Sequence, residues 1–396
     1  MGTRSAGLRA VIRAVRSLSR HGARMRQEII ERQRAAMAEA GWDAMVALSP
    51  ENFAYTTGFV VPSQPIMRWR HAMVLVEADG GTAIVAVDME QTTVRKQAPD
   101  ADIRIWGEFS DDPMAVLADL LRERGLDAAR IGIEMDYLPA GDLQRLARVL
   151  PDARFEACEV RLARMRQIKT AGEIETLRRL SRVSDQAITD ALGAVRAGMT
   201  EMDLAAALTR GVYSLGADRF TLMIVATGPR SVLPNVGPTE RVLAAGDVCR
   251  VEIFSIIDGY HAGVCRTAAV VRPPDHAERI WANLVECKYL VLDMIKPGAS
   301  SRAIYDAFLA KLGELDLPPI AFVGHGIGLH LHEDPYLGPY SDTPLEAGMV
   351  LGIEPLVYET GHGFGMQNKD MVLVTESGSE LLSDYADTDR LLIVSE

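Results

Sequence analysis

One apolar segment of the sequence carries several residues that can do chemistry. The segment is VEIFSIIDGYHAGVCRT, residues 251–267, which is apolar enough to be buried and yet contains Glu252, His261 and Cys265. Carboxylates and imidazoles serve acid–base catalysis and metal binding, and a thiolate activated by a nearby base can attack a substrate directly. A free cysteine is also often a plain buried apolar residue. Asp258 is followed by glycine, a pair typical of a tight turn.

A second segment combines glycines with histidines. It reads GHGIGLHLHEDP, residues 324–335. Its glycines allow the backbone to approach a ligand closely. If the segment is a strand, His330 and His332 lie on one face of it. His325 and His332 are candidate bases, because the pKa of histidine lies near neutral pH.

The part of the chain around these segments repeats itself. RAGMTEMDLAAAL (196–208) is similar to KPGASSRAIYDAF (296–308), and in both a glycine is followed two residues later by Thr or Ser that opens an amphipathic helix. LAAGDVCRVE (243–252) matches LEAGMVLGIE (345–354) at nearly the same offset. Two independent matches at one offset predict two similar halves.

The repeat places two glutamates in equivalent positions. Glu252 and Glu354 close the two matched segments. We therefore expect both carboxylates on equivalent strands, directed into the space between the halves, where a pocket is a natural active site.

Bulk properties narrow the class of protein. The chain has 396 residues, which favours two domains, and a net charge of −12, which argues against nucleic acid as a partner. No apolar run approaches the length of a membrane span. The four cysteines lie far apart without a CxxC spacing, which favours a reducing cytoplasm.

The chain divides into three parts by pattern. Residues 27–163 alternate strand and helix patterns and predict an α/β domain, and residues 164–396 form the duplicated second domain. Residues 1–26 are rich in arginine and contain no acid. This basic N-terminal extension is either a transit peptide or an over-long gene start, with Met25 as the true beginning.

The second domain resembles the pita-bread family, which contains methionine aminopeptidase, the Xaa-Pro peptidases and creatinase. The segments GHGIGLHLHEDP, GMVLGIEP, RQIKTAGEIE and GYHAGVCRT carry the resemblance, which covers nearly everything after residue 27. It implies an α/β (α+β) fold, with a creatinase-type N-terminal domain followed by a pita-bread catalytic domain that has an internal pseudo-two-fold repeat.

The resemblance also implies a metal site, from which this sequence departs. The family's peptidases hold two metal ions with two Asp, one His and two Glu. The matching positions here are Glu252, Gly263, His325, Glu354 and Lys369. A lysine ammonium repels a metal ion. We therefore expect no metal cofactor, with a single divalent ion on Glu252, His325 and Glu354 as the alternative.

Creatinase, the metal-free member, has the most similar pattern. Its catalytic histidine corresponds to Asn235 and one of its glutamates to Cys265, so creatine itself is not the expected substrate. The leading hypothesis is a metal-independent hydrolase of a C–N bond in a small carboxylate-bearing amidine, guanidino or amide compound. The predicted catalytic residues are His325, His332, Glu354, Glu252 and Cys265.

Two arginines favour a substrate with a carboxylate. Arg68 and Arg70 lie in PSQPIMRWRHAM, and in creatinase an arginine matching Arg70 reaches into the partner subunit's site. The planar fork of arginine binds carboxylate through two hydrogen bonds. The resemblance thus implies a homodimer with shared sites; a surface charge pair is the other reading. The predicted substrate-binding residues are Arg70, Arg68, His261, Lys369 and Asn235.

Two alternatives to the leading hypothesis remain. The first is a metal-dependent Xaa-Pro-type aminopeptidase or dipeptidase with a reduced metal site. The second is a pita-bread binding protein without turnover.

Overall fold

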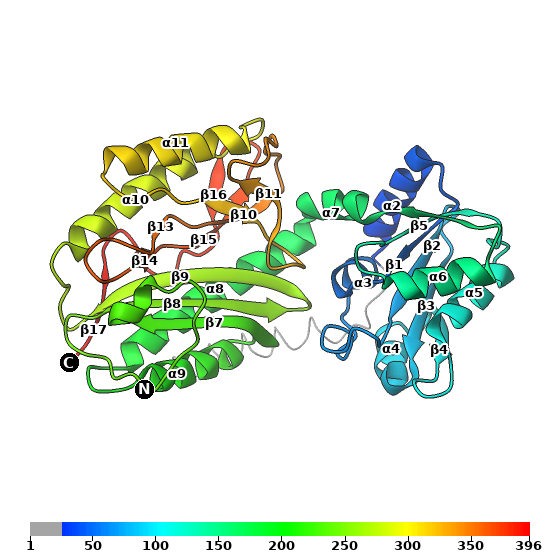
Figure 1. Ribbon diagram of the computed structural model, residues 1–396, viewed down its shortest axis with the longest axis horizontal. Helices are drawn as coiled ribbons and strands as arrows, with labels where there is room; N and C mark the ends of the chain where they lie inside the picture. The colour runs from blue at the N-terminus through cyan, green and yellow to red at the C-terminus, as the bar shows by residue number, and fades with distance from the viewer. Residues whose placement is uncertain (1–25) are drawn as a thin grey trace, which may run out of the picture. The chain divides into compact units, whose positions relative to one another are not determined.

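The computed structural model describes residues 26–396 (Figure 1). The predicted basic extension and the alternative start at Met25 therefore lie outside the described residues, except for Arg26. The chain divides between Arg166 and Gln167 into two compact units. Within the described part, no helix is long and apolar enough to cross a membrane.

The first unit is built on one six-stranded sheet with strand order β4-β3-β2-β1-β5-β6. Strands β1–β2 and β2–β3 are antiparallel, and the other neighbours are parallel. The strands are β1 (Ala44–Ala47), β2 (Met73–Glu77), β3 (Thr82–Val87), β4 (Asp102–Trp106), β5 (Arg130–Ile133) and β6 (Arg154–Ala157). The helices are α2 (Gln27–Ala40), α3 (Pro50–Thr57), η1 (Asp88–Glu90), α4 (Gln91–Gln97), α5 (Pro113–Glu123), α6 (Ala140–Val149) and α7 (Glu159–Gln167).

The central strands β1, β2 and β3 of this sheet are buried on both faces, as their apolar sequences predict. Val46 and Leu75 belong to one apolar cluster, which contains the inner faces of α5 and α6. Their neighbours Met45 and Val74 belong to a second cluster on the opposite face, together with α2 residues. Successive side chains of a strand point to opposite faces, so β1 and β2 each contribute to both clusters.

The second unit holds two larger sheets, each covered by a pair of helices (Figure 1). One has the order β17-β9-β8-β7 and packs against α8 and α9; the other has the order β11-β10-β12-β15-β16. The helices are α8 (Ala171–Ala194), α9 (Glu201–Ser214), η2 (Gly228–Val232), α10 (Ala277–Met294) and α11 (Ser301–Glu314). The strands are β7 (Arg219–Thr227), β8 (Val248–Ile257), β9 (Tyr260–Val270), β10 (Gly324–Gly326), β11 (Glu333–Leu337), β12 (Val350–Ile353), β13 (Leu356–Val357), β14 (Met366–Gln367), β15 (Asp370–Val374), β16 (Ser379–Leu381) and β17 (Leu392–Val394).

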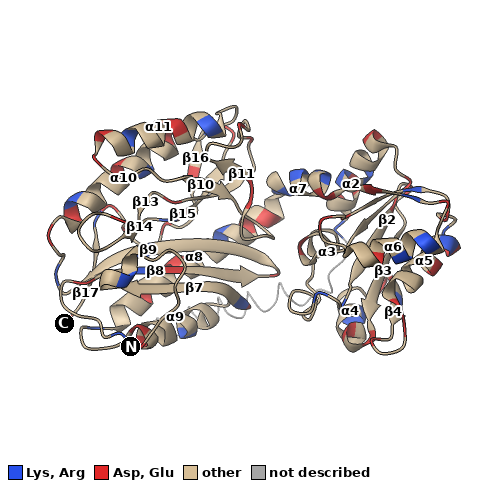
Figure 2. Ribbon diagram, viewed as in Figure 1, with Lys and Arg blue, Asp and Glu red and all other residues tan. Residues whose placement is uncertain are grey.

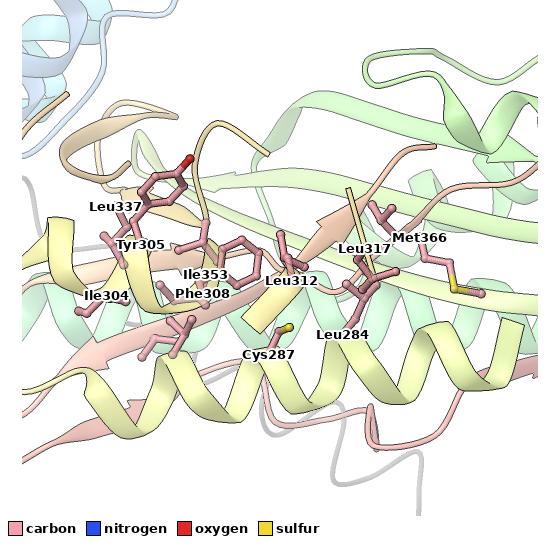
Figure 3. Close-up of a cluster of buried hydrophobic side chains, with 14 of the residues drawn as sticks. Leu284, Cys287, Ile304, Tyr305, Phe308, Leu312, Leu317, Leu337, Ile353 and Met366 are labelled. Carbon is pink, nitrogen blue, oxygen red and sulfur yellow. The ribbon is translucent and has the colours of Figure 1, made fainter. Parts of the chain in front are cut away.

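An apolar core joins α10 and α11 to the second sheet. Figure 3 shows Leu284 and Cys287 of α10 near Phe308 and Leu312 of α11, with Ile353 of β12 in the same cluster. On the outer side of α11, Lys and Arg are mixed with Asp and Glu (Figure 2). The two signs of charge alternate here, unlike the continuous basic face of a nucleic-acid-binding helix.

The internal repeat predicted from the sequence is present in the structure. Thr200 caps α9 and Ser300 caps α11, each accepting a hydrogen bond from the backbone N–H three residues later. Gly198, two residues before the first cap, donates from its backbone N–H to Leu243 O at 2.9 Å. Gly298 donates in the same way to Leu345 O at 2.8 Å, and these two leucines open the second pair of matched segments. The prediction of two similar halves is confirmed.

The segment of residues 251–267 lies within the β8–β9 hairpin, which fixes the pairing of its residues. Asp258 and Gly259 have φ values of 51° and 86°, which the two central residues of a tight hairpin turn require. The predicted Asp-Gly turn is therefore confirmed. The register places Glu252 opposite Cys265.

The glycine–histidine segment is largely a loop. Strand β10 ends at Gly326 and β11 begins at Glu333. His330 and His332 lie in the loop between these two strands, so they do not share a strand face.

Candidate active site

Three ligand-type side chains converge on the ammonium group of Lys369. Its Nζ lies 3.2 Å from Glu252 Oε1, 3.2 Å from Glu354 Oε2 and 3.2 Å from His325 Nε2. All four side chains are buried. An ammonium has three N–H donors, and each of them has one acceptor here.

The two halves of the second unit supply these groups. Glu252 lies on β8 of one sheet, whereas His325 lies on β10 of the other and Glu354 directly follows β12. Lys369 lies between β14 and β15, and its backbone exchanges two hydrogen bonds of 3.2 Å with Cys265 of β9. The repeat predicted that the two glutamates would point into one space, and both reach the same ammonium.

The ring orientation of His325 is fixed by the backbone. Its Nδ1 lies 2.7 Å from the carbonyl oxygen of Gly326, which can only accept, so Nδ1 carries the proton. Nε2 then presents its lone pair to Lys369. A histidine that binds a metal is held in the same way, by a hydrogen bond on its other ring nitrogen.

His332 stacks on His325, with ring centroids 3.6 Å apart and an angle of 15° between the rings. Burial, followed by the proximity of His325 and Lys369, lowers the pKa of His332 to about 3. His332 is therefore neutral near pH 7, and it lines the site as an uncharged imidazole.

The charges of Glu354 and Lys369 stabilise each other. Burial alone would raise the pKa of Glu354, but the nearby Lys369 ammonium lowers it to about 2. Burial would lower the pKa of Lys369, but Glu354 and Glu252 raise it above its ordinary value. Both groups are thus ionised at neutral pH.

A second row of polar groups holds Glu354 in place. Gln367 Nε2 donates to Glu354 Oε2 at 2.9 Å, and Gln367 Oε1 accepts from Arg250 Nη1 at 3.0 Å. Glu354 Oε1 accepts no hydrogen bond from the described residues, although it lies 3.3 Å from His325 Nε2. One carboxylate oxygen is therefore available for a further partner.

Phe254 fills the space beside Gly263. A Cβ atom added to Gly263 would lie 2.3 Å from Phe254 Cε1. The same aromatic ring lies beneath the Lys369 ammonium, whose Nζ is 4.5 Å from the ring centroid. A side chain at position 263 is thus excluded by the ring that contacts the lysine.

Gly263→Ala is expected to lower the free energy of unfolding by about 1–3 kcal/mol, because the added methyl overlaps the Phe254 ring. Urea unfolding would measure the loss, and Phe254→Leu in the same chain should recover part of it. Gly313→Ala is the control, because nothing lies within 4 Å of its added Cβ. Equal stability of the two alanine variants would contradict the overlap.

Cys265 lies inside the β8–β9 hairpin and is fully buried. Burial, followed by the nearby carboxylate of Glu252, raises the pKa of the Cys265 thiol well above its usual value. This environment favours the neutral thiol and disfavours the thiolate that a nucleophile needs.

His261 and Asn235 make no hydrogen bond to the converging groups in the described part of the chain. His261 donates from its backbone N–H to Gly328 O at 2.7 Å, and its ring Nδ1 lies 3.3 Å from the same oxygen. It therefore borders the glycine–histidine loop. Asn235 is exposed in the segment that follows η2.

His261 makes the stability of the protein depend on pH. Burial lowers its pKa from 6.5 to about 4, so the unfolded chain binds the proton first as the pH falls. The free energy of unfolding should therefore decrease between pH 6.5 and about pH 4, and His261→Gln should decrease less over this window. Urea midpoints of both proteins at the two ends of the window test this, and an identical decrease would contradict it.

The two predicted substrate arginines belong to the first unit. Arg70 binds Glu108 through two hydrogen bonds, from Nε at 2.8 Å and from Nη2 at 2.9 Å. Arg68 is exposed and donates to Tyr137 O at 2.9 Å. The fork of Arg70 is thus engaged within its own domain, and its role in a partner subunit's site stays a prediction.

The donor set fits one metal ion and does not fit two. Two carboxylates and one imidazole suit a single divalent ion by type. For a pair of ions, Gly263 offers no donor and Lys369 adds a positive charge at the centre. Among the described residues, no group of three or more His, Cys, Asp or Glu is arranged to hold a metal as the side chains stand.

Three residues of the site were not predicted from the sequence. Gln367 and Arg250 position Glu354, and Phe254 contacts the lysine. A polar residue within a buried apolar strand, such as Arg250 in β8, is a usable signal for a buried network. Phe254 gave no such signal, because aromatic residues are common in strands.

Comparisons with known proteins match both units. Residues 175–376 match the model of metallopeptidase family M24, and residues 29–168 match the creatinase/prolidase N-terminal domain. An uncharacterized peptidase, YqhT, of Bacillus subtilis is 27% identical over 365 residues, which cover 89% of this chain and 97% of the relative. The probable dipeptidase PepE of Mycobacterium tuberculosis is 28% identical over 351 residues, covering 87% of this chain and 91% of the relative.

Solved structures agree with these matches. The X-Pro aminopeptidase of Thermotoga maritima superposes with a TM-score of 0.81 at 24% identity, covering 92% of this chain and 99% of the other. The Xaa-Pro dipeptidase of Bacillus anthracis superposes with a TM-score of 0.79 at 27% identity, covering 93% and 99%. The predicted fold, with a creatinase-type domain before a pita-bread domain, is confirmed.

These findings correct the leading functional hypothesis. The prediction of a metal-independent, creatinase-like hydrolase of a small amidine, guanidino or amide compound is wrong, because the relatives are named dipeptidases and Xaa-Pro dipeptidases. The prediction of no cofactor is wrong for the same reason, since the matching family is one of metallopeptidases. The prediction of a hydrolase acting on C–N bonds is confirmed. With its catalytic unit and its N-terminal domain both matched, the chain belongs to metallopeptidase family M24.

Proposed function

We propose that this protein is a Xaa-Pro-type peptidase, either a dipeptidase or an aminopeptidase, whose metal site is reduced to three ligands. The observation that carries the proposal is the convergence of Glu252, His325 and Glu354 on one point within a family M24 unit. The names of the relatives, among them Xaa-Pro dipeptidases and an X-Pro aminopeptidase, support the substrate class.

The three ligands define what a divalent ion contributes. An ion held by Glu252, His325 and Glu354 would act as a Lewis acid toward the scissile carbonyl. The protein supplies the orientation of its own groups: the Gly326 carbonyl fixes the His325 ring, and Gln367 holds Glu354 Oε2.

His332 adds an uncharged face to the site. It stacks on His325 and is neutral near pH 7, because burial lowers its pKa to about 3. A neutral imidazole can accept or donate one hydrogen bond to a peptide without adding a positive charge. Its role in this proposal is to orient the substrate.

The proposal includes a homodimer and a cytoplasmic location. The homodimer rests on the resemblance to creatinase. The location is supported by the four cysteines, all of which are free thiols. Sedimentation of the purified chain tests the dimer.

The substrate class is tested with the full chain and a panel of peptides. Xaa-Pro dipeptides and tripeptides that begin with Xaa-Pro should be hydrolysed in the presence of Mn²⁺ or Co²⁺, and a chelator should stop the reaction. Dipeptides without proline at the second position are the controls. Hydrolysis of dipeptides alone identifies a dipeptidase, and hydrolysis of the longer peptides identifies an aminopeptidase. No turnover of any peptide with either metal would refute the proposal.

A further inference from the structure

The centre of the three-ligand site is occupied by a group of the protein itself. Glu252 Oε1, Glu354 Oε2 and His325 Nε2 each lie 3.2 Å from Lys369 Nζ. These acceptors are the atom types that bind a divalent ion. We propose that Lys369 is an internal cation that competes with a divalent metal ion for these three ligands, so that the ion binds only by displacing the ammonium.

The room for the lysine is built into the site. A Cβ atom on Gly352 would lie 3.2 Å from Lys369 Cε and 3.5 Å from the His325 ring, so glycine at this position leaves space for the lysine stem. Gly263 leaves space for the Phe254 ring, over which the ammonium lies at 4.5 Å. A cation above an aromatic face is stabilised by the charge distribution of the ring.

The backbone of Lys369 is held firmly, so displacement is a movement of the side chain. Its N–H and C=O both pair with Cys265 at 3.2 Å, and Arg266 Nη1 donates to the same Lys369 carbonyl at 2.9 Å. The ammonium therefore has a fixed tether and a defined position among the ligands. An ion at that position would meet a like charge unless the side chain rotates away.

Competition is also consistent with the charge balance. With the ammonium in place, two buried carboxylates face one positive charge. Without it, Glu252 and Glu354 repel each other and offer their oxygens to any cation that enters. The open acceptor on Glu354 Oε1 adds one more donor atom for an ion.

The test is metal binding by the metal-free full chain, titrated calorimetrically with Mn²⁺ alone. Lys369→Met should bind one Mn²⁺ per chain at least ~100-fold more tightly than the natural protein, because it removes the competing charge. Lys288→Met is the matched control, since Lys288 is also buried but contacts Thr388 at 2.9 Å. It should bind Mn²⁺ as the natural protein does. Adding Glu252→Gln to Lys369→Met should abolish the gain.

Equal affinity of Lys369→Met and the natural protein would overturn the proposal, as would a gain that survives Glu252→Gln. If Lys369→Met fails to fold, crystals of the natural protein soaked in Co²⁺ decide the question by anomalous scattering. An ion on the three ligands with Lys369 rotated away supports competition; an ion bound beside an unmoved Lys369 refutes it, and so does a soak that moves the lysine without placing an ion on those ligands. The readout is binding, so failure of the peptide assay and failure of this proposal are separate results.

Discussion

Glu354→Gln is expected to lower kcat/KM for an Xaa-Pro dipeptide by about 1,000-fold or more. The carboxylate of Glu354 is ionised, receives a hydrogen bond of 2.9 Å from Gln367 and lies 3.2 Å from Lys369. Glutamine has nearly the same shape but no charge. The side-chain N–H₂ of the new glutamine would also face the N–H groups of Gln367 Nε2 or Lys369 Nζ. These groups are donors and cannot accept a hydrogen bond from it.

The measurement is steady-state hydrolysis of a dipeptide that the natural protein cleaves, beside a metal titration of both proteins. Glu346→Gln is the matched control, because Glu346 is an exposed carboxylate in the same repeat segment. It should retain full activity. Circular dichroism establishes that Glu354→Gln is folded. A folded Glu354→Gln protein with more than a tenth of the natural activity would exclude Glu354 from the catalytic machinery.

The position of Glu354 could be predicted because the same helix-capping and turn signals occur twice in the sequence. Thr200 and Ser300 cap matching helices, and glycines with φ near 89° precede both matched strands, at Gly246 and Gly348. Local rules of capping and turn formation give two similar halves, and similarity of the halves places Glu252 and Glu354 in equivalent positions. The long-range result thus followed from short-range patterns.

The centre of the site could not be predicted in this way. Gly263 reads as a lost ligand, whereas the structure shows that the Phe254 ring takes the space and then contacts Lys369. A sequence states residue types and their order along the chain, but the room around a side chain depends on strands that meet in space. From residue types alone, a lysine among carboxylates predicts that no metal ion binds.

The wrong function has the same origin. The missing donor at Gly263 and the ammonium of Lys369 predict the loss of the cofactor, whereas Glu252, His325 and Glu354 remain together around one point. The similarity of the whole chain to metallopeptidases and dipeptidases outweighs the identity of these few residues. The convergence of these three side chains and the match to the metallopeptidase family together favour the proposed three-ligand metal site.

The second large effect is structural and concerns Arg266. Its Nε lies 2.8 Å from Asp185 Oδ1 and its Nη2 lies 2.8 Å from Asp370 Oδ1, and all three side chains are buried. Arg266→Met is expected to lower the free energy of unfolding of the second unit by about 3–5 kcal/mol, because it leaves two carboxylates buried without their cation. Urea unfolding followed by circular dichroism, with the transition of the second unit analysed separately, measures this loss.

Arg302→Met provides the contrast, since Arg302 pairs with Asp306 on the exposed side of α11 and such pairs contribute about 0.5 kcal/mol or less. A loss below about 1 kcal/mol for Arg266→Met would show that the two aspartates find other partners or protons. Arg266 also contacts the candidate active site. Arg266 donates to the backbone carbonyl of Lys369 at 2.9 Å, so the charge that stabilises the fold also holds the lysine at the point where Glu252, His325 and Glu354 converge.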